Sequence, residues 1–320
     1  QAEDGIRDVE RSRGLGDVYK RQLIYNPGNN QPLETLAVAR YGVGNTFIKA
    51  WDKELHGDQW KRLSDLIDER DPDKIGINYS DTFALADGIT HTEYDLFINS
   101  LKSQYKERLV SAEDLAVGWL ETRSDLEMTI YQQICRIAHE ILASGLTDEV
   151  IQTGITTTND VAWWYRDRIR ELKLTAWFHP SVSIQRKSSP NLDAKSSILA
   201  RHDDNIIMHG DLLHVDFGIT YLRLSTDTQQ HAYVLKTGEN AIPNELKVAM
   251  NNGIGLQDIL TAEFVTGRTG NEILATALAR AKKEGIKPSI YTHPIGFHGH
   301  GAGPTIGMWD QQGGVPGGGD

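Results

Sequence analysis

The chain has 320 residues, of which 39% are hydrophobic and 24% are charged, a composition typical of a globular protein long enough for two domains. No apolar run approaches the ~20 residues that cross a bilayer, and the formal net charge of −11 argues against a nucleic-acid partner. The single cysteine, Cys135, excludes an intramolecular disulfide and leaves the redox compartment open.

The start of the chain lacks an initiator methionine, since the first methionine is Met128. Residues 4–22, DGIRDVERSRGLGDVYKRQ, resemble translated sequencing adapter. We therefore assign residues 1–22 as a non-native segment and leave them out of the fold, the alternative being a natural charged helix. We favour a cytoplasmic location, and export stays open because the native N-terminus is missing on this assignment.

Residues 23–120 mix short apolar strand-like runs with polar helical stretches, which predicts a small α/β domain. The strand-like runs include residues 46–48 and 75–79, and residues 59–69 are helical in pattern.

A longer helix is predicted from Ser124, a capping residue, to Gly145, because isoleucines recur at helical spacing between them. Further helices are expected at residues 160–172, 243–260 and 271–284. The glycine-rich stretch 313–319 reads as a loop.

Residues 212–217 alternate in a way that predicts a strand, with Leu213, Val215 and Phe217 on one face and Asp216 on the other. A second strand-like run, 232–235, follows Asp227. If the two runs pair antiparallel, Asp216 and Asp227 can lie opposite each other with Cβ atoms about 4.5 to 5.5 Å apart. Two carboxylates that close repel each other unless a cation lies between them.

A metal site is therefore predicted, with Asp216, Asp227 and the later His293 as ligands. Carboxylate oxygens with an imidazole nitrogen suit Mn, Zn, Co or Fe in hydrolytic sites. Taken alone, Asp216 would more simply cap a turn, and His214, on the same strand face, would more simply pack in the sheet than orient a ligand. His298 reads as a loop side chain, and a kinase reading of Asp216-Phe217-Gly218 fails because no His-Arg-Asp loop precedes it.

This constellation resembles the creatinase, aminopeptidase P and methionine aminopeptidase family, the pita-bread metallopeptidases, and within it Xaa-Pro aminopeptidases most. The family places its first ligand in an Asp-x-Gly strand, its second eleven residues on, and its third at the start of a His-x-x-Gly-x-x-x-His run. Asp216, Asp227 and His293 match these ligands, and His300 matches the second histidine, which contacts substrate in the family.

The resemblance implies a creatinase-like α/β N-terminal domain at 23–120 and an α+β pita-bread metallopeptidase domain at 121–320. It also implies hydrolysis of the N-terminal peptide bond of peptides, with Xaa-Pro preferred, by a hydroxide that bridges two divalent ions, Mn first and Zn or Co next. Peptide is then the substrate, and a homodimer is compatible with the family. The family completes its site with two glutamates further on, and no glutamate follows His300 here. We therefore expect a C-terminally truncated, inactive chain that also lacks its first strand.

One departure from the family concerns residues 181–186, which contain no histidine where the family often carries one that contacts substrate. Trp177, Phe178 and His300 are the candidates to line a proline pocket. Two alternatives stay open: a prolidase or creatinase-like C–N hydrolase of the same fold, and a non-catalytic relative that serves as a binding module.

Overall fold

The computed structural model describes residues 53–186, 205–296, 299–317 and 319, with the backbone of 23–25 and 47–49. The segment 1–22, predicted to be non-native, and His298 both lie outside these residues, so neither prediction is tested. The chain divides into two compact units, Gln1–Ala116 and Val117–Asp320. No helix in the described part of the chain is long and apolar enough to span a membrane.

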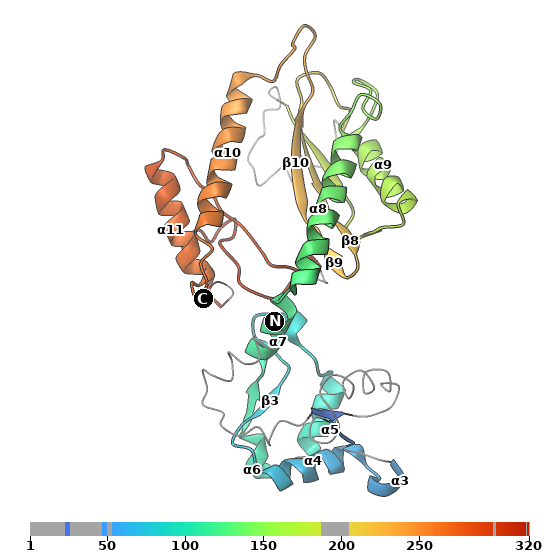
Figure 1. Ribbon diagram of the computed structural model, residues 1–320, viewed down its shortest axis with the longest axis vertical. Coiled ribbons are helices and arrows are strands. Elements are labelled where there is room, and N and C mark those ends of the chain that lie inside the picture. Colours follow the sequence, from blue (N-terminus) through green and yellow to red (C-terminus); the bar gives the residue numbers. More distant parts are fainter. Residues whose placement is uncertain are drawn as a thin grey trace. The chain divides into compact units, whose positions relative to one another are not determined.

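The first unit combines short parallel strand pairs with helices (Figure 1). The predicted helix at 59–69 is α4 (Gln59–Arg70), and the strand-like runs form β2 (Phe47–Lys49) and β3 (Ile75–Ile77). Phe97, Leu101 and Tyr105 form its buried cluster. The other elements are β1 (Leu23–Tyr25), α3 (Lys53–His56), η2 (Ala84–Ala86), α5 (His91–Ser100), α6 (Ser103–Lys106), β4 (Leu109–Ser111) and α7 (Glu113–Glu121), whose last turn belongs to the second unit.

The second unit begins its main core with α8 (Asp125–Gly145), the helix predicted from the Ser124 cap. Ser124 and Glu127 form a capping box that satisfies backbone donors at the helix start. The helix α9 (Thr158–Glu171) follows and packs beside α8 (Figure 1). Tyr165 of α9 is fully buried and donates a hydrogen bond to the Leu142 carbonyl, at 2.9 Å, so the two helices are tied by a polar contact inside an apolar core.

The sheet that carries Asp216 has the strand order β10-β7-β6, all antiparallel. In β7 (Leu212–Phe217), the side chains of Leu213, Val215 and Phe217 are at most 1% exposed and pack with residues of α8 and α9. Burying each such side chain contributes roughly 1.5 to 3 kcal/mol. This confirms the predicted apolar face and leaves the opposite face for Asp216. The neighbouring strands are β6 (Ser181–Gln185) and β10 (Thr228–Tyr233).

The expected pairing of Asp216 with Asp227 is wrong in its register, because Asp216 lies opposite Gln229 and β10 begins one residue after Asp227. The chain between them forms a separate hairpin, β8 (Ile219–Tyr221) and β9 (Leu224–Ser225), which joins β5 (Thr175–Ala176) in another sheet. Asp227 is therefore a diagonal neighbour of Asp216, displaced by two residues along the adjacent strand.

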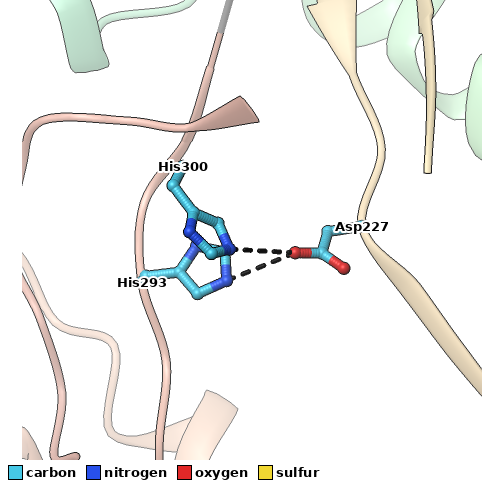
Figure 2. A group of neighbouring side chains, drawn as sticks. All are labelled: Asp227, His293 and His300. Atoms are coloured by element: carbon cyan, nitrogen blue, oxygen red, sulfur yellow. Dashed lines mark ion pairs between the residues drawn. The ribbon is translucent and has the colours of Figure 1, made fainter. Parts of the chain in front are cut away.

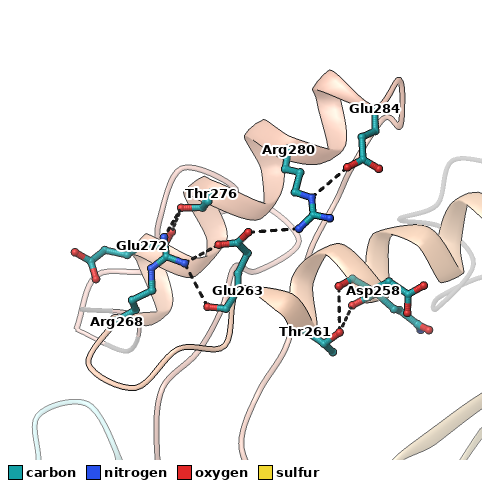
Figure 3. Close-up of polar contacts among 9 residues, drawn as sticks. Asp258, Thr261, Glu263, Arg268, Glu272, Thr276, Arg280 and Glu284 are labelled. Atoms are coloured by element: carbon teal, nitrogen blue, oxygen red, sulfur yellow. Dashed lines mark hydrogen bonds and ion pairs between the residues drawn. The ribbon is translucent and has the colours of Figure 1, made fainter.

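A second core in this unit lies between α10 (Asn244–Ala262) and α11 (Gly270–Lys283), near the predicted helix bounds. It includes Leu274, Ala277 and, from the segment after α11, Ile290 and Ile306. Polar contacts fasten the turn between the helices: Arg268 binds Glu263 at 2.6 Å and Thr276 at 3.1 Å (Figure 3). This core supports the chain that leads to the hairpin β11 (Ile295–Gly296) and β12 (Gly299–His300).

Candidate metal centre

Asp227 is placed by the buried residue before it. Thr226 is 1% exposed, exchanges backbone and side-chain hydrogen bonds with Ile219, and accepts a 2.6 Å hydrogen bond on its carbonyl from the indole N–H of Trp177. Gly218 has no room for a side chain, because a Cβ there would lie 2.2 Å from the same indole nitrogen. Asp227 thus directly follows a tightly packed turn, and this packing fixes where its side chain begins.

His293 and His300 reach Asp227 from the other core of the unit (Figure 2). The Nε2 atom of His293 lies 3.2 Å from Oδ2 of Asp227, and Nε2 of His300 lies 3.8 Å from the same oxygen. Their ring centroids are 3.8 Å apart. Because one donor atom from each of the three residues lies within 4.8 Å of the others, they could hold a single ion.

Asp216 adds a second carboxylate beside Asp227. Its pKa is raised, first because the carboxyl is buried and next because the negative charge of Asp227 lies near it. Its Oδ1 atom is buried without a hydrogen-bond partner among the residues that the structure describes. A buried carboxylate oxygen without a donor is costly, and a cation between the two aspartates would remove that cost.

The histidines differ in their electrostatics. The pKa of His293 is raised, mainly by its hydrogen bond to Asp227. Its Nδ1 contacts the Pro294 carbonyl at 3.0 Å, which favours the tautomer with the proton on Nδ1 and leaves Nε2 free to bind a metal. The pKa of His300 is lowered, first by burial against its neighbours and then by the charge of His293.

The donor set fits a divalent ion, since it supplies carboxylate oxygens and imidazole nitrogen with an outer hydrogen bond that fixes the ligand tautomer. All four residues singled out in the sequence lie here. Asp227, His293 and His300 converge directly, while Asp216 joins through Asp227. The individual roles stay predictions: metal ligands for Asp216, Asp227 and His293, and a substrate contact for His300.

Sequence reasoning missed two tyrosines whose pKa values respond to the charge of Asp227. Burial raises the pKa of Tyr131 to about 12, and the charge of Asp227 adds to that shift. Tyr291, whose pKa is raised by the same causes, has its ring 5.7 Å from that of His293. Both hydroxyls therefore stay protonated at neutral pH and can donate hydrogen bonds. The position of Tyr131 within the apolar stripe of α8 was the available signal.

The segment expected to line a substrate pocket lies beside the histidines. Trp177 meets the ring of His300 edge to face, with centroids 5.2 Å apart, and meets Phe178 at 4.5 Å. Gly299 leaves space for this indole, since a Cβ there would come within 2.0 Å of it. On β6, the position opposite Asp216 is Ser181, so no histidine stands at that point.

Solved structures resemble the chain in fold. An X-Pro aminopeptidase from Thermotoga maritima MSB8 aligns with a TM-score of 0.54 and 15% identity, covering 91% of this chain and 73% of that one. The prolidase from Pyrococcus furiosus gives 0.52 and 15%, covering 91% and 74%. The N-terminal domain of the FACT complex subunit SPT16 from Eremothecium gossypii gives 0.56 and 13%, covering 87% and 68%.

No curated protein sequence shows significant similarity to the chain. At these identities, the structural likeness establishes the pita-bread fold and leaves the activity to the residues of the site. The sequence itself matches the family model of metallopeptidase family M24 over residues 129–315, a range that includes Asp216, Asp227, His293 and His300. The resemblance first suggested by the spacing of those four residues is thus confirmed, and the chain belongs to metallopeptidase family M24.

Proposed function

We propose that the chain is an Xaa-Pro aminopeptidase-type metallopeptidase whose cations are held by Asp216, Asp227 and His293. One observation carries the proposal: two neighbouring carboxylates and an imidazole meet at Asp227, with a buried Asp216 oxygen that has no donor in the described part of the chain. A site built only for stability would place a donor or a fixed positive charge at that oxygen.

The native ions are two divalent cations in this proposal, with Mn preferred and Zn or Co as substitutes. When bound, such ions supply Lewis acidity and lower the pKa of water toward ~7. Asp227 would be the ligand that the cations share, because it contacts His293 at 3.2 Å and its charge raises the pKa of Asp216.

The residues of the chain then bind and orient the peptide. His300, whose side chain is 61% exposed, is free to donate a hydrogen bond to the carbonyl oxygen of the scissile bond. Trp177 has its ring fixed by the bond to Thr226 and, with His300, offers an aromatic wall to the proline ring. An imide ring packs on such a surface without needing a hydrogen-bond acceptor, because proline carries no N–H.

A non-catalytic role is the second candidate, and one observation favours it. The FACT subunit domain, which is not named as a peptidase, matches this chain with a TM-score of 0.56, beside 0.54 for the X-Pro aminopeptidase. The fold alone therefore does not imply catalysis. The retained carboxylate pair argues the other way, because a binding module gains nothing from two adjacent aspartates that repel each other. A prolidase or a creatinase-like C–N hydrolase would share the same cations and differ in the pocket.

Metal binding is the sharpest test, since it depends on the described residues. Isothermal titration of the purified chain with Mn²⁺ and Co²⁺ should show binding that Asp227→Asn abolishes. Asp258→Asn, a change at an exposed residue of α10, is the matched control and should bind as the wild type does. Equal binding by Asp227→Asn and wild type would refute the site. In a chain completed with the family's two glutamates, release of the first residue from Xaa-Pro-containing tripeptides, with Xaa-Pro dipeptides in parallel, separates aminopeptidase from prolidase.

A further inference from the structure

The hairpin β11–β12, which carries His300 and begins two residues after His293, is too small to be stable alone. Each strand has two residues, and an isolated two-stranded hairpin is at best marginally stable. One flanking hydrogen bond, from the Gly301 amide to the Pro294 carbonyl at 2.9 Å, closes it. Contacts from outside the hairpin must therefore fix where His293 and His300 point.

Such a contact comes from Arg123, in the junction between α7 and α8. One guanidinium nitrogen, Nη1, donates to the carbonyls of Leu120 and Thr122 at 2.7 and 3.0 Å. The other, Nη2, donates to the Ile295 carbonyl of β11 at 3.0 Å. A single planar group thus joins the junction, which begins the long buried helix α8, to the strand that follows His293.

The register explains why the Ile295 carbonyl is available. Since the Gly301 amide bonds to the Pro294 carbonyl across the hairpin, the next pair, Ile295 and His300, is a pair without ladder hydrogen bonds. The Ile295 carbonyl therefore points away from β12, toward Arg123. Gly296 permits this approach, because a Cβ at that position would lie 2.8 Å from Nη2 of Arg123.

We infer that Arg123 is a positioning residue for the metal centre, which sets the hairpin so that His293 and His300 face Asp227. The inference rests on the proposed metal-binding function. The direction of the change in metal affinity distinguishes positioning from a simple charge effect. Removing a positive charge near a cation site would by itself strengthen metal binding. Loss of positioning has the opposite sign and weakens it.

Metal affinity of the whole chain tests the inference. Arg123→Ala should bind Co²⁺ about 10- to 100-fold more weakly than wild type, the usual cost of removing a residue that orients a ligand. Arg123→Lys keeps the charge but replaces the two guanidinium nitrogens that reach the two segments by a single ammonium nitrogen, so it should also bind Co²⁺ more weakly. Arg168→Ala, which removes an arginine from an exposed ion pair on α9, is the control and should bind normally. Unchanged or tighter binding by Arg123→Ala would overturn the inference.

Chemical rescue adds a readout that a general loss of packing would not give. A cavity of about 200 Å³ lies beside Arg123, lined also by Leu120, Pro294 and Ala302. Removing the side chain enlarges it, so millimolar guanidinium should restore Co²⁺ affinity and the visible absorption of bound Co²⁺ in Arg123→Ala. Urea at the same concentration should not. Rescue by both, or by neither, would contradict a specific role for the guanidinium group.

A measurement without metal keeps this inference distinct from the proposed function. In the metal-free chain, hydrogen exchange at the Gly301 amide should be about tenfold faster in Arg123→Ala or in Arg123→Lys, with amides of α8 unchanged. If the wild-type chain binds no metal but Gly301 exchange responds, the proposed function fails and the anchoring of the hairpin stands. If Gly301 exchange is unaffected in both variants, Arg123 does not position the hairpin.

Discussion

The two halves of the metal centre are built in different ways. Asp216 lies on a six-residue strand whose opposite face carries three side chains at most 1% exposed, packed under α8 and α9. His300 lies on the two-residue strand β12, and His293 lies between the isolated Thr292–Ile306 bridge and the two-residue strand β11. Arg123 and Trp177 hold this segment from outside. The buried core therefore fixes the position of Asp216, whereas a few local contacts fix the positions of the histidines.

This difference suggests a division of labour within the site. The carboxylates are neighbours that repel, so a strong core is needed to keep them together before a cation binds. The imidazoles do not repel Asp227, so a few contacts from outside the hairpin are enough to hold them beside it. Substitutions in the two halves should then separate stability from metal binding.

The largest expected effect is on the stability of the aspartate half. Phe217→Ala should lower the free energy of unfolding by about 3 to 5 kcal/mol, because the Phe217 side chain is 0% exposed and packs on Tyr165 with ring centroids 5.3 Å apart. Phe264→Ala, at a residue that is 52% exposed, is the matched control and should change it by less than about 0.5 kcal/mol. Urea titration followed by circular dichroism measures both, and similar losses in both variants would contradict a special role for the β7 core.

The next effect separates the two histidines. His293→Ala should remove metal from the site, because it deletes the imidazole nearest Asp227, at 3.2 Å. His300→Ala should retain metal and, in an active enzyme, lower turnover roughly 100- to 1000-fold through loss of a group that stabilises the developing oxyanion. Metal content by atomic emission, measured beside peptide release, tests this. If His300→Ala also strips the metal, His300 is a ligand, as its 3.8 Å distance to Asp227 allows.

A smaller effect concerns pH. The hydrogen bond to Asp227 raises the pKa of His293, so in the metal-free chain this pair stabilises the fold below the unfolded value of ~6.5. That contribution is lost as pH rises through the raised folded pKa. Metal affinity should change in the opposite sense, rising about tenfold per pH unit until His293 is deprotonated, because the ligand must lose its proton. Titration in two buffers of different ionisation enthalpy should detect the released proton, and pH-independent affinity with no proton release would exclude His293 as a ligand.

Much of the aspartate half could be predicted from the sequence because its signals are local. The capping residue Ser124, the helical spacing of α8 and the alternation of β7 each lie within one element. The register of β10 could not, since it depends on the hairpin between the strands. That hairpin turns at Leu222 and Arg223, both with positive φ, where no glycine or asparagine marks the turn.

The contact that Arg123 makes with the hairpin was beyond prediction, whereas Trp177 was expected beside His300. Arg123 lies 172 residues before Ile295 in the sequence, and only the folded chain brings the two together. Spacing identified the residues with the chemistry, but the residues that position them follow no spacing rule. Burial and register, which are properties of the tertiary structure, decide which of them make contact.

The smallest effect has an unusual sign, and it tests whether the two aspartates carry a cost without metal. The pKa of Asp216 is raised, so the folded chain holds that proton more tightly than the unfolded chain. Stability is therefore greatest below the unfolded pKa of ~3.9 and falls as pH rises toward the folded value, leaving the full cost at neutral pH.

Asp216→Asn should remove this electrostatic cost and raise Tm of the metal-free chain by roughly 2 to 4 °C, the shift that about 1 kcal/mol gives in a domain of this size. Added Mn²⁺ should reverse the order, since binding to the folded state stabilises only a chain that keeps its ligands. Calorimetry of wild type, Asp216→Asn and the control Asp258→Asn, with and without Mn²⁺, measures both, and a metal-free Asp216→Asn less stable than wild type would show that the carboxylate pair costs the fold nothing.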